Sequence, residues 1–258
     1  MKVVILAGGQ GTRIAESGDP RPKPMVEIGG QPILWHIMKY YSHYGLNDFI
    51  ICCGYMGYMI KEYFSNYYLH RSDITFDFSQ DNKMTVHSNI AEPWKVTLVD
   101  TGQNTMTGGR IKRVEKYVNG ETFMMTYGDG VSDVNLNDLL EQHRNNNKTI
   151  TITAVQPGGR YGLIDFDDRG EVRGFREKAV EDGGWINAGF MVMEPKIFDY
   201  LTDDTCTLEF KPFEQLSNEN NMQAYRHYGY WQAMDTQRDR GFLEQRLEEN
   251  DAPWKVWD

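Results

Sequence analysis

Val3-Val4-Ile5-Leu6-Ala7, near the start of the chain, runs directly into Gly8-Gly9-Gln10-Gly11-Thr12-Arg13. The first five residues are all apolar, and a short apolar run of this kind predicts a buried strand. Glycines after a strand let backbone N–H groups approach an oxyanion without a Cβ in the way. Arg13 and, further on, Lys23 add positive charge. The stretch therefore predicts a strand that ends in a phosphate-binding loop.

This loop matches neither of the common glycine-rich nucleotide motifs. No Lys-Ser or Lys-Thr follows the glycines, as a P-loop requires, and Ile14 stands where a dinucleotide-binding fingerprint needs its third glycine. A Gly-Gly-x-Gly sequence alone is a weak signal, because a plain tight turn explains it about as well. Arg13 and the segment Pro22-Lys23-Pro24-Met25 favour the phosphate site.

Composition limits the classes of protein to which the chain can belong. Its 258 residues, 40% of them hydrophobic, can bury a full core, and we expect a single domain over residues 1–258. The formal net charge of -10 argues against general binding to nucleic acid or to an anionic membrane. An anionic ligand would therefore need basic residues concentrated at its own site.

The cysteines and the apolar runs indicate a cytoplasmic protein. Cys52 and Cys53 lie side by side in the apolar run from Phe49 to Cys53, which is typical of strand packing and not of a disulfide framework. No apolar stretch reaches the length of a membrane span, and the N-terminal run is too short for a signal sequence. We therefore expect a cytoplasmic location and no membrane partner.

Strand and helix patterns alternate after the glycine loop. A helical pattern opens at Pro32 and closes at Gly45, residues 48–53 form a second strand, and residues 58–67 form a second amphipathic helix. This alternation predicts an α/β fold of Rossmann-like type, with a mostly parallel mixed central sheet flanked by helices. A further helix is predicted over residues 108–118.

Two segments with alternating apolar residues depart from this pattern. Residues of about 70–99 are predicted to form a β-rich insertion, which is our candidate for subunit contacts. A second hairpin is predicted over residues 163–175. Between these insertions, a strand over residues 123–127 stops at Gly128-Asp129-Gly130. This places a second loop at the carboxyl end of a core strand, where ligands bind in open α/β sheets.

Short motifs spread over nearly the whole chain resemble those of the sugar-phosphate nucleotidylyltransferases, the pyrophosphorylases that make nucleotide sugars. These motifs are Leu6 to Arg13, Pro22 to Met25, Tyr127 to Gly130, Glu177-Lys178, Asn187 to Phe190 and Met234 to Thr236. Other segments resemble the members that use CTP and glucose 1-phosphate, namely Gly29 to Lys39, Phe49 to Tyr55, Thr107 to Arg110 and Ala252 to Lys255. The chain departs from the family's common Glu-Lys-Pro by having Ala179, which removes a proline from that loop.

The resemblance implies an enzyme that transfers the cytidylyl group of CTP to α-D-glucose 1-phosphate, giving CDP-glucose and pyrophosphate for deoxysugar and O-antigen biosynthesis. It also implies Mg2+ as the cofactor and a homo-hexamer. A sugar phosphate, with a second pKa of about 6, is already mostly dianionic at neutral pH, so the reaction needs no strong general base. Two alternatives remain open: a nucleotidylyltransferase that uses UTP, dTTP or a different sugar 1-phosphate, and a non-catalytic nucleotide-sugar-binding subunit.

The residues expected to carry this chemistry fall into groups. Arg13, Lys23 and Asp129 are the catalytic candidates, because positioning and charge neutralisation bring two anions together. Asp129 and Asp235 are the expected Mg2+ ligands. The expected nucleotide-binding residues are Leu6, Ala7, Gly8, Gly9, Gln10, Gly11, Thr12, Arg13, Lys23, Thr105, Arg110 and Gly128. The expected sugar-phosphate-binding residues are Gly162, Glu177, Lys178 and Asn187, in a sugar-binding C-terminal half of about 156–258.

Each assignment has a plain structural alternative. Lys23 could be a solvated loop lysine, Asp129 and Asp235 could be acidic turn residues, and Glu177-Lys178 could be a surface ion pair. Arg110 points to a ligand, because a cation near a helix N-terminus is unfavourable unless an anion lies close. The histidines and cysteines show no zinc-binding spacing and are assigned to packing and surface roles.

Overall fold

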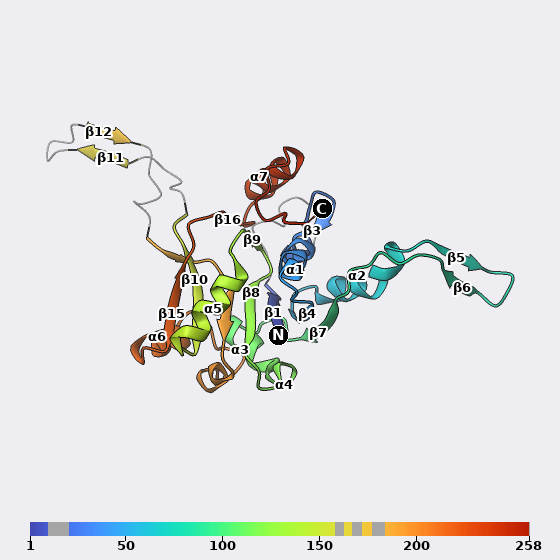
Figure 1. Cartoon of the computed structure of the whole chain (residues 1–258), viewed down its shortest axis with the longest axis horizontal. Helices are drawn as coiled ribbons and strands as arrows, with labels where there is room; N and C mark the ends of the chain where they lie inside the picture. The colour runs from blue at the N-terminus through green and yellow to red at the C-terminus, as the bar shows by residue number, and fades with distance from the viewer. Residues whose placement is uncertain (10–20, 158–162, 167–171, 177–183, 258) are drawn as a thin grey trace.

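The computed structural model describes residues 1–9, 21–157, 163–166, 172–176 and 184–257 (Figure 1). In this part of the chain the central sheet has the strand order β13-β10-β14-β8-β1-β4-β7, and β15 pairs with β10. Its strands are β1 (Lys2–Ala7), β4 (Asp48–Cys53), β7 (Lys95–Asp100), β8 (Phe123–Tyr127), β10 (Ile150–Val155), β13 (Ile186–Asn187), β14 (Met191–Met193) and β15 (Met222–Arg226).

The central sheet is mixed but mostly parallel. β8, β1, β4 and β7 pair in parallel, and so do β10 and β15. β14 is antiparallel to both β8 and β10, so β8 and β10 share one direction, and β13 opposes β10. The predicted α/β fold is therefore confirmed.

Helices cover both faces of the sheet and bury two apolar clusters. Every residue of β1 after Lys2 is buried, as expected for a parallel strand covered on both sides. Val3 and Ile5 pack on the face covered by α1 (Ile33–His43), α2 (Gly57–His70), α5 (Leu136–Asn146) and α7 (Gln237–Glu248). Val4 and Leu6 pack on the face covered by α3 (Thr107–Arg113), α4 (Glu115–Val118), the 3-10 helix η4 (Pro195–Tyr200) and α6 (Lys211–Asn218).

The helix boundaries agree with the sequence in one case and differ in another. α1 follows Pro32 and is followed by Gly45, whose φ of +77° is easily adopted only by glycine. The helix predicted over 108–118 is instead two helices, because Val114 adopts φ -99° and ψ 2° between α3 and α4. The prediction of one continuous helix was wrong at that residue.

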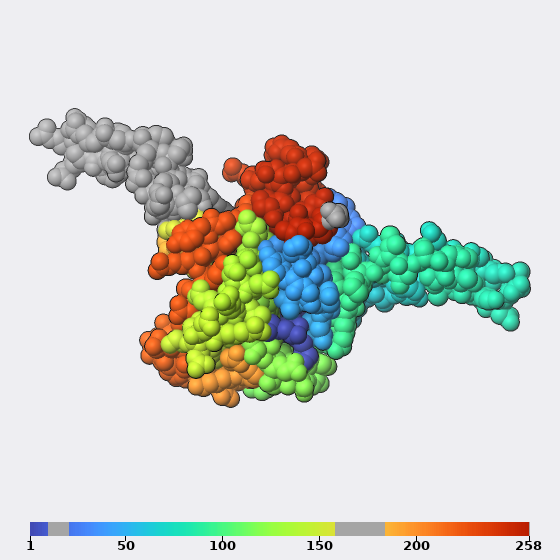
Figure 2. All heavy atoms as spheres, in the orientation of Figure 1, coloured from blue at the N-terminus to red at the C-terminus, as the bar shows by residue number. Residues whose placement is uncertain are grey.

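A two-stranded arm projects from the body of the molecule (Figures 1 and 2). It consists of β5 (Ile74–Asp77) and β6 (Lys83–Val86), which pair antiparallel as the alternation predicted. β7 also lies within the predicted insertion of 70–99, but it pairs with β4 and belongs to the central sheet. A second antiparallel hairpin joins β11 (Leu163–Phe166) to β12 (Val172–Arg176), also as predicted.

No helix among the described residues is both long and apolar enough to cross a membrane.

Candidate active site

A cavity of about 370 Å³ lies where β1 and β8 end. Because the two strands are parallel neighbours, their carboxyl ends lie at one edge of the sheet. All the described residues that the sequence assigned to the nucleotide or the metal line this cavity, namely Leu6, Ala7, Gly8, Gly9, Lys23, Thr105, Arg110, Gly128, Asp129 and Asp235. Pro24, Met106, Thr107 and Tyr127 line it as well.

Lys23 connects the two predicted metal ligands. Its Nζ donates to Asp129 Oδ2 at 2.7 Å and to Asp235 Oδ1 at 2.6 Å. Lys23 begins the short 3-10 helix η2 (Lys23–Met25), which follows Pro22 and buries Pro24 and Met25. The structure therefore does not support the alternative of a solvated loop lysine, since the Lys23 side chain is only 14% exposed.

Strand pairing explains how Asp129 and Asp235 meet although they are far apart in sequence. β9 (Gly130–Ser132) follows Asp129, and β16 (Trp231–Ala233) ends just before Met234 and Asp235. The two strands are antiparallel, with Ala233 opposite Gly130, and the Met234 N–H donates to the Asp129 carbonyl at 2.9 Å. The two carboxylates are thus brought to one ammonium group by a backbone ladder.

The charges at this point act on each other. Burial alone would lower the pKa of Lys23, but the charge and the hydrogen bonds of Asp129 and Asp235 outweigh it and raise that pKa above its ordinary value. Lys23 is therefore a cation at neutral pH. Its ammonium offsets the repulsion between two carboxylates that both reach into the cavity.

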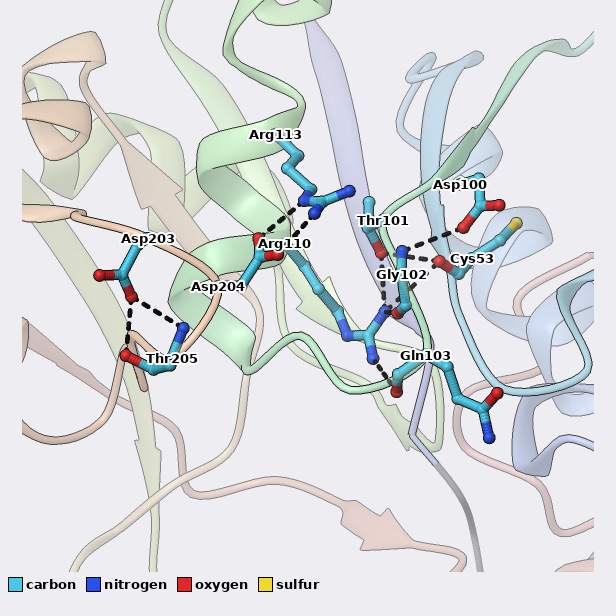
Figure 3. A network of polar contacts seen from close by, with 10 residues as sticks. All are labelled: Cys53, Asp100, Thr101, Gly102, Gln103, Arg110, Arg113, Asp203, Asp204 and Thr205. Carbon is cyan, nitrogen blue, oxygen red and sulfur yellow. Dashed lines mark hydrogen bonds and ion pairs between the residues drawn. The ribbon is translucent and has the colours of Figure 1, made fainter.

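Arg110 connects the ends of three strands (Figure 3). Its side chain is 5% exposed, and Nη1 donates to Thr101 Oγ1 and to the Gly102 carbonyl, both at 2.7 Å. Nη2 donates to the carbonyls of Gly8 at 3.1 Å and Gln103 at 3.2 Å, and Nη1 also donates to Cys53 O at 3.4 Å. These acceptors follow or end β1, β4 and β7, so one guanidinium holds together the edge that forms the cavity.

Arg110 has other partners in the structure than those expected from the sequence. A cation near a helix N-terminus was expected to need an anion, whereas in the structure neutral carbonyl and hydroxyl oxygens surround it. Among the described residues no ion pair with a carboxylate is formed, so its positive charge is not cancelled within the cavity wall. Arg110 can therefore attract a phosphate through its field even while its N–H groups are engaged.

Glycines at the cavity allow close approach of backbone and side chain. A Cβ on Gly8 or on Gly54 would overlap the Arg110 guanidinium. A Cβ on Gly128 would lie 2.9 Å from the Leu6 carbonyl oxygen and 3.1 Å from Pro24 Cγ. Gly9 is different, because no atom of the described residues lies within 4 Å of its Cβ position. Gly8 and Gly128 are thus required by packing, whereas the described part of the chain does not crowd the Cβ position of Gly9.

Several predicted site residues lie outside the described part of the chain. They are Gln10, Gly11, Thr12, Arg13, Gly162, Glu177 and Lys178. Asn187 belongs to the described residues but is not among those that line the cavity. Its Nδ2 donates to the hydroxyl of Tyr127 at 3.0 Å, and Tyr127 does line the cavity. Sequence reasoning gave no role to Tyr127, although it directly precedes Gly128-Asp129 in a quoted motif, and it missed Thr107 as a lining residue.

The donor set fits a hard divalent cation only together with a ligand. Asp129 and Asp235 supply carboxylate oxygens, and they meet at one point, as their shared hydrogen bonds to Lys23 show. No group of three or more His, Cys, Asp or Glu residues that could hold a metal exists within the described ranges. Mg2+ commonly takes one or two carboxylates plus substrate phosphates and water, so two carboxylates suffice for that ion.

The fold is that of a nucleotidyl transferase. The sequence model of the family described as "Nucleotidyl transferase" matches residues 2–236. The chain therefore belongs to the nucleotidyl transferase family and is an enzyme of that class.

Similar proteins point to a more specific group within this family. The chain is 52% identical over 259 residues to glucose-1-phosphate cytidylyltransferase of Salmonella typhi, and the match covers 100% of both chains. It is 41% identical over 258 residues to the probable glucose-1-phosphate cytidylyltransferase of Bacillus subtilis, again over 100% of both. The likeness to glucose-1-phosphate cytidylyltransferases thus extends over the whole chain.

Solved structures share the fold. HddC from Yersinia pseudotuberculosis, complexed with GMP-PN, has a TM-score of 0.67 at 25% identity, covering 95% of this chain and 99% of the other. UDP-glucose pyrophosphorylase complexed with UDP-glucose has a TM-score of 0.69 at 16% identity, covering 96% and 98%. At that identity the second likeness concerns the fold alone.

Proposed function

We propose that the chain transfers the cytidylyl group of CTP to α-D-glucose 1-phosphate and releases CDP-glucose and pyrophosphate. The observation that carries this proposal is the 52% identity over the full length of both chains with a relative of that name. The cavity supports it, because a lysine and two carboxylates meet there beside glycines at the end of β1. Such groups suit phosphates and a divalent cation.

The reaction needs positioning and charge neutralisation more than proton transfer. An oxygen of the sugar phosphate attacks the α-phosphorus of CTP, and the new P–O bond forms while the bond to pyrophosphate breaks. Pyrophosphate leaves with the electron pair of that bond. Lys23 would offer its charge to the nucleotide phosphates, which compete for the ammonium with Asp129 and Asp235. No base is required, because the attacking phosphate is already largely a dianion.

Asp129 and Asp235 are the residues that we propose to hold Mg2+. Bound there, the ion would neutralise negative charge on the phosphates. Lys23 already gathers the two carboxylates at one place, which supports a shared role for them. The cation would take over part of the electrostatic role that the ammonium has in the protein alone.

The other sequence assignments stay proposals for the same reaction. We propose Arg13, with Gln10, Gly11 and Thr12, for the triphosphate of CTP. We propose Gly162, Glu177, Lys178 and Asn187 for the sugar phosphate, within a C-terminal half of about 156–258. The deoxysugar and O-antigen pathway and the cytoplasmic location stay predictions of the sequence.

Pyrophosphate release across a substrate panel tests the reaction. CTP, UTP and dTTP are each paired with glucose 1-phosphate and with other hexose 1-phosphates, with and without Mg2+. We expect release with CTP, glucose 1-phosphate and Mg2+ together, and little without the ion. Turnover confined to another nucleotide or sugar phosphate would replace the proposed specificity. CTP binding by calorimetry without pyrophosphate release would instead favour the non-catalytic nucleotide-sugar-binding subunit.

We also propose that the arm formed by β5 and β6 contacts another copy of this chain, in a homo-oligomer that the family resemblance implies is a hexamer. The arm carries exposed apolar side chains, among them Phe76, Phe78, Met84 and Val86, and Phe78 is 79% exposed. A two-stranded ribbon is only marginally stable by itself in water. A second copy that covers these side chains would remove both the apolar exposure and the two free edges.

A further inference from the structure

The segment 203–209 packs tightly against the N-terminal half of α3. A Cβ on Gly109 would lie 2.7 Å from the Asp203 carbonyl oxygen, and a Cβ on Gly108 would lie 2.9 Å from the Cys206 carbonyl oxygen. Both glycines are therefore needed for this approach. They belong to Thr107-Gly108-Gly109-Arg110, the stretch from which the buried Arg110 side chain extends.

Hydrogen bonds fasten the two segments to each other. The Met106 N–H donates to the Asp204 carbonyl at 2.8 Å, and the Gly109 N–H donates to the Cys206 carbonyl at 3.1 Å. Arg113 donates from Nε at 2.7 Å and from Nη2 at 2.5 Å to the two carboxylate oxygens of Asp204 (Figure 3). These two hydrogen bonds fix the orientation of the Arg113 guanidinium relative to the Asp204 carboxylate. α3 is thus held by backbone hydrogen bonds and by an ion pair to the segment 203–209.

Glu209, at the end of this segment, joins α3 to β8. Its Oε2 accepts from Thr107 Oγ1 at 2.6 Å, and its Oε1 accepts from the Tyr127 hydroxyl at 2.5 Å. Both are short O–H bonds to a carboxylate, which are among the stronger hydrogen bonds in proteins. The Leu208 N–H donates to Thr107 Oγ1 at 3.0 Å, and Asn187 Nδ2 donates to the Tyr127 hydroxyl at 3.0 Å.

The two residues that Glu209 holds belong to different walls of the cavity. Thr107 lines it at the start of α3, and Tyr127 lines it at the end of β8, directly before Gly128-Asp129. Glu209 itself is not among the described residues that line the cavity. Each hydroxyl has one hydrogen and already gives it to Glu209, so neither can donate to a substrate without breaking this bond.

We propose that Glu209 is a positioning residue, which fixes the α3 wall of the cavity relative to the β8 end that carries Asp129. This inference rests on the proposed nucleotidyl transfer, because it concerns the geometry in which that transfer occurs. The arrangement explains why a carboxylate is present at a point that does not face the cavity. It also ties Asn187, through Tyr127, to the wall that carries Arg110.

Removal of the Glu209 carboxylate tests the proposal. Glu209→Ala leaves two hydroxyls without their acceptor, and we expect kcat to fall by up to about 10²-fold, since small displacements of reacting groups have effects of that size. Glu209→Gln should recover most of the rate. Its amide oxygen accepts from one hydroxyl, and its NH2 group donates to the other. A matched control is Glu214→Ala, an exposed glutamate on α6, which should keep the rate of the unchanged chain.

Two further measurements distinguish positioning from substrate contact. If Glu209 acts through its partners, Tyr127→Phe added to Glu209→Ala should cost little more than Glu209→Ala alone, and so should Thr107→Val. Replacing the sugar phosphate by a deoxy analogue should lower the rate by the same factor in the variant as in the unchanged chain. Additive losses, or a changed order among the deoxy analogues, would overturn the proposal and make Glu209 a substrate ligand.

Different measurements decide the proposed reaction and the proposed role of Glu209. Turnover of the unchanged chain with CTP and glucose 1-phosphate decides the proposed reaction. The ratio of variant rate to unchanged rate, measured with whichever substrates the chain uses, decides the role of Glu209. Thermal unfolding of each variant accompanies the kinetics. A Glu209→Ala variant that folds and keeps its full rate would overturn the proposal, as would a Glu209→Gln variant as slow as Glu209→Ala.

Discussion

Lys23 Nζ lies 2.7 Å from Asp129 Oδ2, so the cation assigned to the nucleotide and the carboxylate assigned to the metal are hydrogen-bonded to each other. The same ammonium lies 2.6 Å from Asp235 Oδ1. In the protein alone, Lys23 thus sits between the groups that we propose for Mg2+. Arrival of a metal and a triphosphate would exchange these partners, with the carboxylates turning to the metal and the ammonium to phosphate.

Replacing Lys23 by alanine should remove most of the turnover while the chain stays folded. The variant lacks the positive charge that we propose acts on the phosphates, and loss of one preorganised group of this kind lowers kcat by about 10² to 10³-fold. The initial rate of pyrophosphate release measures this loss. Lys61→Ala is the control, because Lys61 is an exposed lysine on α2. Equal rates for the two variants would remove Lys23 from its assigned role.

Gly8 and Gly9 should respond very differently to alanine. In Gly8→Ala the new methyl group would overlap the Arg110 guanidinium, which must then shift and lose hydrogen bonds. Such overpacking costs about 1–3 kcal/mol in the free energy of unfolding. In Gly9→Ala the new methyl group meets no atom of the described residues within 4 Å, so this substitution should change the free energy of unfolding by less than about 0.5 kcal/mol.

Urea denaturation of the ligand-free chain compares these two glycine variants. Substrate binding is left out of the measurement, since Gly9 lines the cavity. Two equally stable variants would contradict the packing of Arg110 against Gly8.

The strand ends that form the cavity could be predicted from the sequence, whereas the contacts between them could not. The apolar run before Gly8 and the one before Gly128 identify buried strands, and parallel pairing puts both ends at one edge. Local sequence does not say which distant oxygen a side chain meets. Arg110 meets the Gly8 carbonyl 102 residues away, and Glu209 meets the Tyr127 hydroxyl 82 residues away.

Elements without a strong local pattern were also missed. α6 and β15 were not predicted, because their apolar residues are few and β15 is only partly buried. Residues 185–193 do not form one continuous strand, because Gly189 and Phe190 adopt φ values of +76° and +47°. Gly189 allows this turn, and a Cβ there would lie 3.0 Å from the Tyr127 ring. The turn separates β13 from β14, both of which pair with β10.

Acid should destabilise the chain through His36. This side chain is buried in α1, and its Nε2 donates to the Ile28 carbonyl at 2.9 Å. Burial lowers the pKa of His36 from 6.5 to about 4, although the bond to Ile28 acts in the other direction. Between these values the unfolded chain binds a proton that the folded chain does not, so stability falls as the pH drops from 6.5 to about 4. The full effect is about 3 kcal/mol.

The pH dependence of the free energy of unfolding, measured by urea denaturation, checks this expectation. His36→Gln cannot take up a proton and should show a shallower decline over the same pH interval. His43→Gln removes an exposed histidine from the same helix and should keep the slope of the unchanged chain. A decline of equal steepness in His36→Gln would show that other groups cause the acid sensitivity.

Polar substitutions on the arm should weaken self-association without unfolding the body. Phe76 and Phe78 lie two residues apart and stack with ring centroids 6.3 Å apart and an interplanar angle of 13°. They form an exposed apolar patch on the arm, which a second copy would bury. Sedimentation velocity of Phe76→Ser/Phe78→Ser should therefore show smaller species than the unchanged chain at equal concentration. Tyr117→Ser, on α4, is the control for loss of an exposed aromatic residue. The arm is ruled out as the contact between copies if the unchanged chain sediments as a monomer. It is also ruled out if the double variant forms species of the same size as the unchanged chain.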